Sequence, residues 1–144
     1  MDAALMSDDE IDSFLRERGS GTLSLTDEQE TYAVPESFGY DGDYLYFQFV
    51  HSDDSHKMAF LETTDVATFT TFTDNRPGQS VIVRGPIEPV AKEDEVCASR
   101  AFSANSVVPM LNVSVDKSVD ELSFEFYKLC PVDISGRKFG DNVS

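Results

Sequence analysis

The segment HSDDSHKM, which begins at His51, holds much of the nitrogen chemistry of this chain. It contains both histidines, His51 and His56, and also Lys57, the one lysine or arginine between Arg18 and Arg76. Asp and Glu outnumber Lys and Arg 27 to 11, and the formal net charge is −16. Imidazoles, hydroxyl groups and a cation gathered in so acidic a chain point to the binding of an anion.

A helix predicted over about residues 55–61 would help to bind that anion. Its first turn contains Ser55, His56 and Lys57, and it follows a strand that ends near His51. The first turn of a helix has backbone N–H groups without partners inside the helix, and it carries a partial positive charge. Together with the Ser55 hydroxyl and the Lys57 ammonium, these groups would suit a phosphate.

Two other interpretations of this segment stay open. His51, Asp53, Asp54 and His56 offer nitrogen and oxygen ligands to a metal ion, but their spacing matches no established metal motif, and Lys57 would repel a cation. A charge-rich turn can also simply face water, with its aspartates capping the helix. We expect no metal site, and we expect His51 to be a hydrogen-bonded residue at the rim of the fold.

The strand before this segment has one face of small residues. In TYAVPESFGY, which begins at Thr31, successive side chains of a strand point to opposite sides, so Ala33, Pro35, Ser37 and Gly39 share a face. Such a face lets a planar ligand lie against the backbone. The alternative is an edge strand or a close contact between sheets, where Pro and Gly are also common.

The remaining patterns predict one mainly β domain over residues 1–144. A capping box from Ser7 to Glu10 predicts a helix over 8–18, a second is predicted over 93–104, and Asp41-Gly42 predicts a two-residue hairpin turn. Mostly antiparallel strands with few helices favour a small barrel. Strands are predicted over residues 22–25, 31–40, 44–51, 66–73, 80–90 and 122–129.

Composition excludes several functions. So acidic a surface would repel the phosphates of nucleic acid, and it is typical of proteins adapted to concentrated salt. No signal peptide and no apolar run of about 18 residues occurs, which predicts a cytoplasmic protein that does not contact membranes. Cys97 and Cys130 lie in no metal-binding or redox spacing, so we expect buried, inert thiols.

In their order along the chain, these segments resemble the pyridoxamine 5'-phosphate oxidase-like family of FMN-binding split barrels, and within it the nitroimidazole-resistance-type flavoproteins. The resemblance rests on YAVPESFGY, the DGD turn, YLYFQF, the HK pair that begins a helix, SVIVRGPIEPV and SGRKFG, and it covers most of residues 8–140. It implies a six-stranded antiparallel split β-barrel with a few short helices. It also implies a homodimer with FMN bound at sites lined by both subunits.

The resemblance implies three groups of FMN contacts: strand residues along the flavin ring, a basic pair at the phosphate, and basic residues that reach the flavin or the substrate. The first group is Tyr32, Ala33, Val34, Ser37, Phe47 and Gln48. The second is His56 and Lys57, and the third is Arg84, Arg137 and Lys138. Relatives commonly have Arg where this chain has His56, so one imidazole donor replaces a bidentate guanidinium.

In such a protein the flavin ring carries the redox chemistry, and no acid or base side chain is needed. The expected function is an oxidoreductase that passes electrons from NAD(P)H to a small acceptor. One alternative is a non-catalytic protein that binds or carries a flavin, a deazaflavin or haem, with His51 or His56 as the haem ligand. The other is a dimeric module that binds no ligand.

Overall fold

The structure is a computed structural model that describes residues 2–51, 56–75, 77–105 and 123–140. Antiparallel strands dominate, which confirms the mainly β class. The strands are β1 (Asp2–Leu5), β2 (Ser20–Thr26), β3 (Thr31–Ser37), β4 (Gly39–Tyr40), β5 (Leu45–His51), β6 (Ala67–Thr73), β7 (Gly78–Gly85), β8 (Ile87–Pro89), β9 (Ser123–Leu129) and β10 (Asp133–Gly140). The helices are α1 (Asp8–Glu17), α2 (His56–Thr63) and α3 (Glu95–Asn105), with a 3-10 turn, η1 (Lys92–Asp94), before α3.

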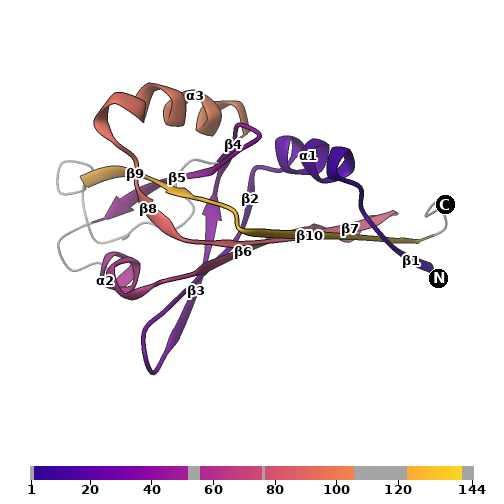
Figure 1. The fold of residues 1–144 in the computed structure, drawn as a ribbon, viewed down its shortest axis with the longest axis horizontal. Coiled ribbons are helices and arrows are strands. Elements are labelled where there is room, and N and C mark those ends of the chain that lie inside the picture. The colour runs from indigo at the N-terminus through magenta and orange to yellow at the C-terminus, as the bar shows by residue number, and fades with distance from the viewer. Residues whose placement is uncertain (1, 52–55, 76, 106–122, 141–144) are drawn as a thin grey trace.

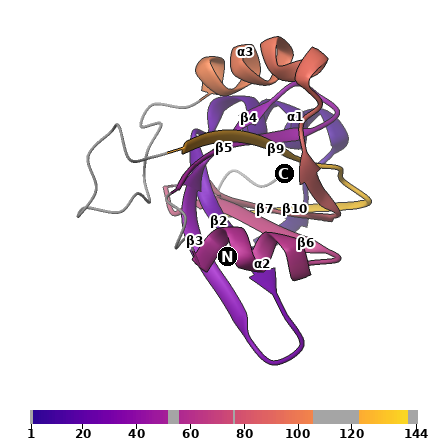
Figure 2. The same ribbon diagram turned by 90° about the vertical axis from the view of Figure 1, so that its left-hand side faces the viewer.

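The strands form two sheets in a split-barrel arrangement (Figure 1). In hydrogen-bonding order, the six-stranded sheet is β1-β10-β7-β6-β2-β3, and the four-stranded sheet is β4-β5-β9-β8. Figure 2 shows the smaller sheet above the larger one, with α3 over the smaller sheet. The described residues contain ten strands where the sequence predicted six, because β1 and β10 were missed and two predicted strands are interrupted.

The predicted strand over residues 31–40 is interrupted at Phe38, and its two parts lie in different sheets. β3 pairs with β2, whereas β4 pairs with β5. The predicted hairpin is therefore confined to β4 and β5, and its turn has four residues, 41–44, instead of two. The Asp41 carboxylate holds this turn because it accepts the backbone N–H groups of Asp43 and Tyr44, at 2.8 Å each.

The core lies between the two sheets. At its centre Phe47 of β5 meets Phe69 of β6, with ring centroids 5.3 Å apart. Helix α1 adds three buried side chains from one face, as its predicted amphipathic pattern requires. The inner faces of the sheets contribute Leu23, Leu25, Val34, Phe69, Val81 and Val83 from the larger sheet, and Leu45, Phe47, Phe49 and Leu129 from the smaller one.

The three predicted helices are confirmed to within a few residues. Ser7 accepts the backbone N–H of Glu10, and Glu10 accepts that of Ser7, which is the predicted capping box. Helix α3 covers the outer side of the smaller sheet, where Tyr46 packs against it. Gly39 of β4 lies directly under the backbone of α3, so closely that a Cβ atom there would overlap Phe102.

No helix in the described part of the chain is long and apolar enough to span a membrane.

The expectation of buried cysteines was wrong: Cys97 is exposed and Cys130 is partly exposed. The reason for Cys97 is its position on α3, whose buried side is formed by Ala98, Ala101 and Phe102.

Candidate functional site

The six-stranded sheet has a second face, opposite the core, which we call the outer face. Directly paired residues on neighbouring strands lie on the same face, so the register arranges the outer face in rows. The first row is Arg84, Thr68, Ser24 and Ala33, and the second is Ile82, Thr70, Thr22 and Pro35. All eight residues are exposed or partly exposed, whereas the residues between them are buried.

The end of the outer face at β3 is flat. Ala33 and Pro35 are exposed there, beside Ser24 and Thr22 of β2. β3 is the last strand of this sheet, with β2 as its neighbour on one side. The predicted face of small residues is thus exposed at Ala33 and Pro35 but buried at Ser37 and Gly39. Ser37 is buried because the chain passes from there into the smaller sheet, below α3.

Three arginines lie on or beside the outer face. Arg84 ends the first row, Arg137 pairs with Leu5 and Ser80 in the ladder, and Arg18 comes just before Ser20. Within the described residues, none of the three forms an ion pair. Lys92 and Arg100 form none either, whereas Arg16 pairs with Asp12, Lys57 with Glu36, Lys128 with Glu88 and Lys138 with Glu10.

Lys57 lies inside the fold, although its place in the segment HSDDSHKM predicts that it faces an anion. Its side chain is 4% exposed, and Nζ donates a hydrogen bond of 2.6 Å to Oε2 of Glu36. The ammonium also lies 5.0 Å from the ring centroid of Phe49. Burial raises the pKa of Glu36, and the charge of Lys57 opposes that rise. Sequence reasoning missed this ion pair. The signal for it is Glu36, a carboxylate on the same face of β3 as the core residues Tyr32 and Val34.

The other predicted strand contacts point in several directions. Tyr32 and Val34 face the core, where Tyr32 stacks on Phe60 of α2 at 5.2 Å. Phe47 is completely buried, so its side chain contacts only the interior. Gln48 is partly buried on the side of the smaller sheet that faces α3.

The predicted basic residues are also separated. Lys138 points toward α1, where Nζ donates to Oε2 of Glu10 at 2.6 Å, whereas its neighbour Arg137 is exposed on the outer face. The side chains of His51 and His56 lie outside the described part of the structure, as do Asp53 and Asp54. Of the predicted site residues, the structure therefore brings Ala33 and Arg84 into one row, with Arg137 on the same face.

A groove of about 260 Å³ lies beside Arg18, and both outer-face residues and the buried Thr71 line it. We call it the Arg18 groove. Among the described residues, it is lined by a guanidinium and several hydroxyl groups and by no carboxylate. Sequence reasoning missed it because its walls come from segments far apart in the chain. The lining residues are Arg18, Ser20, Gly21, Thr22, Pro35, Thr70, Thr71 and Phe72.

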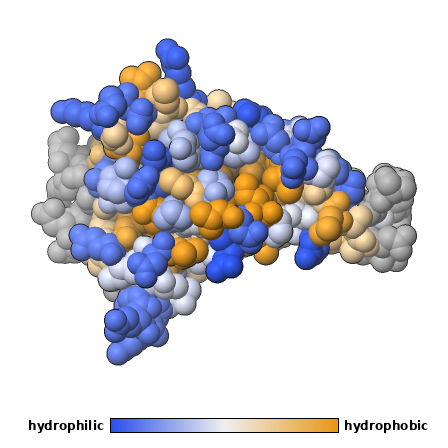
Figure 3. Space-filling view, viewed as in Figure 1, coloured by the Kyte–Doolittle hydropathy of each residue, from blue (hydrophilic) through white to orange (hydrophobic). Residues whose placement is uncertain are grey.

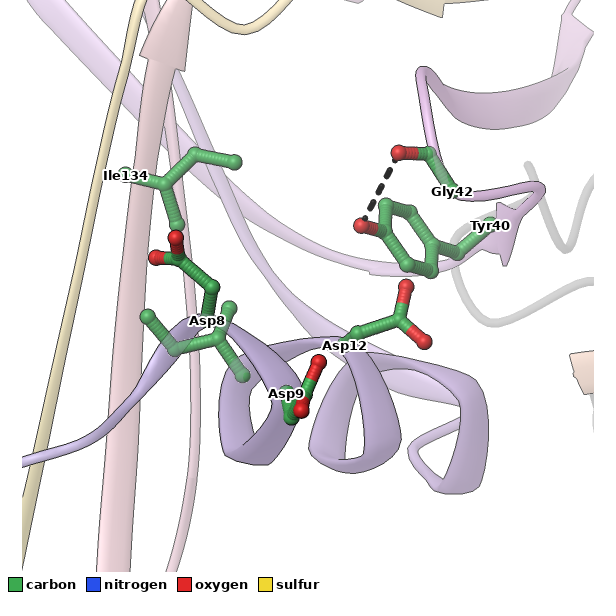
Figure 4. A pocket seen from close by; sticks show the side chains of 7 residues that line it. Asp8, Asp9, Asp12, Tyr40, Gly42 and Ile134 are labelled. Carbon is green, nitrogen blue, oxygen red and sulfur yellow. Dashed lines mark hydrogen bonds between the residues drawn. The ribbon is translucent and has the colours of Figure 1, made fainter.

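Two other grooves are acidic. One, of about 340 Å³, lies between α1 and the turn after β4, where Figure 4 shows Asp8 beside Ile134 and Asp12 beside Tyr40. The other, of about 480 Å³, is lined by Asp27, Glu28, Gln29, Thr63 and Asp65. Carboxylates disfavour an anionic ligand in both grooves. The described residues also contain no group of three or more His, Cys, Asp or Glu residues that could hold a metal ion.

Comparisons with known proteins agree with this fold. A similar solved structure is an FAD-binding protein from Mesorhizobium loti, with a TM-score of 0.75 and 20% identity, covering 98% of this chain and 99% of the other. Another is a candidate 5-nitroimidazole antibiotic resistance protein from Bacteroides thetaiotaomicron, with a TM-score of 0.74 and 19% identity, covering 96% and 89%. A third is an FAD and haem binding protein from Mycobacterium smegmatis, with a TM-score of 0.69 and 17% identity, covering 98% and 75%.

Comparison with curated protein sequences gives no match. The sequence model of a family described as pyridoxamine 5'-phosphate oxidase, in contrast, matches residues 7–138. That match covers nearly all of both sheets and all three helices. The chain therefore belongs to the pyridoxamine 5'-phosphate oxidase family.

Proposed function

We propose that this chain binds a flavin, expected to be FMN, on the outer face of the six-stranded sheet, and that it acts as an oxidoreductase. The observation that carries the proposal is the flat area formed by Ala33 and Pro35 of β3 with Ser24 and Thr22 of β2. A planar ring can lie there against small side chains and strand backbone. Similar structures named as FAD-binding proteins support the same class of ligand.

The residues of this face fit a flavin ring. Ala33 leaves room for the ring, and Arg84, at the other end of the same row, offers hydrogen-bond donors to its oxygen and nitrogen atoms. When bound, the flavin would supply hydride and electron transfer between NAD(P)H and a small acceptor. The residues of the chain would bind and orient it and exclude water.

Lys57 does not fit the phosphate of a ligand on this face. Its ammonium is buried against Glu36, on the core side of β3, whereas Ala33 and Pro35 point to the outer face. To reach a ligand there, Lys57 would have to leave Glu36, a buried carboxylate, without its partner. For a ligand on the outer face, we therefore expect other groups to bind the phosphate.

We also infer that two copies of the chain share the outer face. Large hydrophobic side chains are exposed on it, and in Figure 3 hydrophobic residues reach the surface along the level of β6, β7 and β10. Such patches are usually covered by a partner, and a two-fold dimer is the commonest closed assembly. The exposed side chains are Leu5 (70%), Phe72 (66%), Ile82 (42%) and Phe139 (39%).

An absorption spectrum of the purified protein tests the proposal. We expect the bands of an oxidised flavin, and separation of the released cofactor should identify FMN. Haem or deazaflavin bands would instead favour the carrier function suggested by the relative named as an FAD and haem binding protein. Steady, flavin-dependent oxidation of NAD(P)H should then distinguish an oxidoreductase from a carrier.

A substitution at Ala33 tests where the flavin binds. Ala33→Trp should prevent flavin binding because the indole would occupy the flat area, whereas Ala104→Trp, at an exposed position of α3, should not. Both variants keep the core unchanged. A wild-type protein that binds neither copurified nor added flavin would refute the proposed function, and full binding by Ala33→Trp would refute the proposed place.

A further inference from the structure

The ion pair of Glu36 and Lys57 lies behind the flat area that we propose for the flavin ring. Successive side chains of a strand point to opposite sides, so Glu36 follows Pro35 directly along β3 but faces the core. In the ladder Glu36 is opposite Gly21 of β2, one position from Pro35 and Thr22, which are opposite each other in the flat area. The carboxylate and the flat area therefore lie on opposite sides of the same part of β3.

The two charges of this pair are not equally close to the flat area. Glu36 belongs to β3 itself, whereas Lys57 reaches the carboxylate from α2, with 2.6 Å between Nζ and Oε2. The Lys57 ammonium also lies 5.0 Å from the ring centroid of Phe49, which belongs to the smaller sheet. The negative end of the pair is therefore directed toward β3, and the positive end toward the interior.

Burial lets these two charges act over a longer distance than charges at the surface. The side chains of Glu36 and Lys57 are 6% and 4% exposed, whereas those of the pair Glu10 and Lys138 are 37% and 20% exposed. Water and mobile ions screen surface charges strongly and buried charges much less. The carboxylate of Glu36 should thus make the electrostatic potential at the flat area more negative, even in concentrated salt.

We propose that the Glu36 carboxylate lowers the reduction potential of a flavin bound at the flat area. The inference rests on the proposed flavin function and adds a residue that regulates its redox chemistry from the far side of the strand. When NAD(P)H donates a hydride, two electrons and one proton are transferred, NAD(P)+ is released, and the ring gains one negative charge. Glu36 opposes this charge, so it favours the oxidised flavin and makes the reduced flavin a stronger donor to the acceptor.

The reduction potential of bound FMN, compared between wild type and Glu36→Gln, tests this effect. The amide has the size of the carboxylate and can still accept a hydrogen bond from Lys57, but it carries no charge. The affinity for reduced FMN relative to oxidised FMN should rise about tenfold, which is a rise of about 30 mV for a two-electron couple.

Glu10→Gln is the matched control. It removes a carboxylate that also lies 2.6 Å from a lysine, Lys138, but on α1 and with greater exposure. The potential of FMN bound to this variant should equal that of wild type. If Glu36→Gln does not fold, the double variant Glu36→Leu, Lys57→Met replaces it. Loss of both charges should also raise the potential, by a smaller amount, because the carboxylate is the nearer of the two.

Molar KCl distinguishes a buried charge from a surface charge. The difference between wild type and Glu36→Gln should persist in it, and a difference that vanished would overturn the inference. If wild type bound no flavin, the proposed function and the inference would fall together. If wild type bound flavin but neither Glu36→Gln nor the double variant raised its potential, the proposed function would stand and the inference would be overturned.

Discussion

The ion pair between Glu36 and Lys57 shows how a single residue can mislead prediction from sequence. Both side chains are almost completely buried, at 6% and 4% exposure, and their 2.6 Å contact links β3 to α2. Two charges removed from water are stabilised only while each has the other, so the pair fixes the position of α2 but contributes little net stability. Its role is to position these elements.

Removing one partner should therefore cost more than removing both. We expect Glu36→Leu to lower the free energy of unfolding by about 3–5 kcal/mol, because the Lys57 ammonium would remain buried without a counter-charge. The double variant Glu36→Leu, Lys57→Met should recover most of that loss. Denaturant unfolding measures both. If the two single losses simply added in the double variant, the charges would not be coupled.

Glu10 gives the expected pH dependence at the residue scale. The hydrogen bond from Lys138, followed by that from the backbone of Ser7, lowers the pKa of Glu10 from 4.5 to about 2. Because the folded state binds this proton more weakly than the unfolded state, the contribution of Glu10 to stability is complete above pH 4.5 and is lost as the pH falls toward 2.

The melting temperature of Glu10→Gln should therefore fall less steeply between these pH values than that of wild type. Glu17→Gln, an exposed change at the end of the same helix, is the control and should follow wild type. An unchanged slope for Glu10→Gln would mean that the Lys138 contact does not persist in solution.

At the scale of elements, the crossing of the chain from one sheet to the other depends on Gly39. After β3, the chain enters the smaller sheet as β4, and α3 packs directly on it. A Cβ atom at residue 39 would overlap the backbone of Ala101 and Phe102, which cannot move without shifting the helix. This close approach explains why a residue without a side chain is needed at the crossing.

We expect Gly39→Ala to lower the free energy of unfolding by about 1–3 kcal/mol or more, because it overpacks a backbone contact. Gly78→Ala is a suitable control. The three atoms nearest to a Cβ atom there all belong to the ring of Phe139, which is 39% exposed and can turn aside. Equal losses in both variants would show that α3 yields easily, contrary to the expectation.

At the scale of the whole molecule, the outer face carries both exposed hydrophobic side chains and arginines without ion pairs among the described residues. The net charge of the whole chain, in contrast, is −16. A face of this kind can be shared by two copies without the repulsion that acidic surfaces would cause. The salt-adapted surface predicted from composition stays a prediction, which melting temperatures in low and molar KCl can check.

The proposed dimer can be tested with two matched variants. Phe72→Asp, on the outer face, should convert the dimer to a monomer, whereas Val96→Asp, on α3, should not. The two side chains are similarly exposed in the single chain, at 66% and 63%, so neither change disturbs the core. Light scattering measures the mass. A wild-type monomer, or a dimer that survives Phe72→Asp, would refute a shared outer face.

The sequence by itself determined the features that depend on neighbouring residues: the capping box of α1, the strand alternation, and the small face that begins at Ala33. The tertiary structure decided where each face points and which residues meet. Lys57 pairs with Glu36 across 21 positions, and Arg18 meets Thr71 across 53. The physical reason is that local periodicity sets which side of an element is apolar, whereas the partner of a charge depends on how distant strands and helices pack. Thus the lysine expected to bind phosphate became an internal counter-charge, and Arg18, which no motif marked, is held by Thr71 without an ion pair among the described residues.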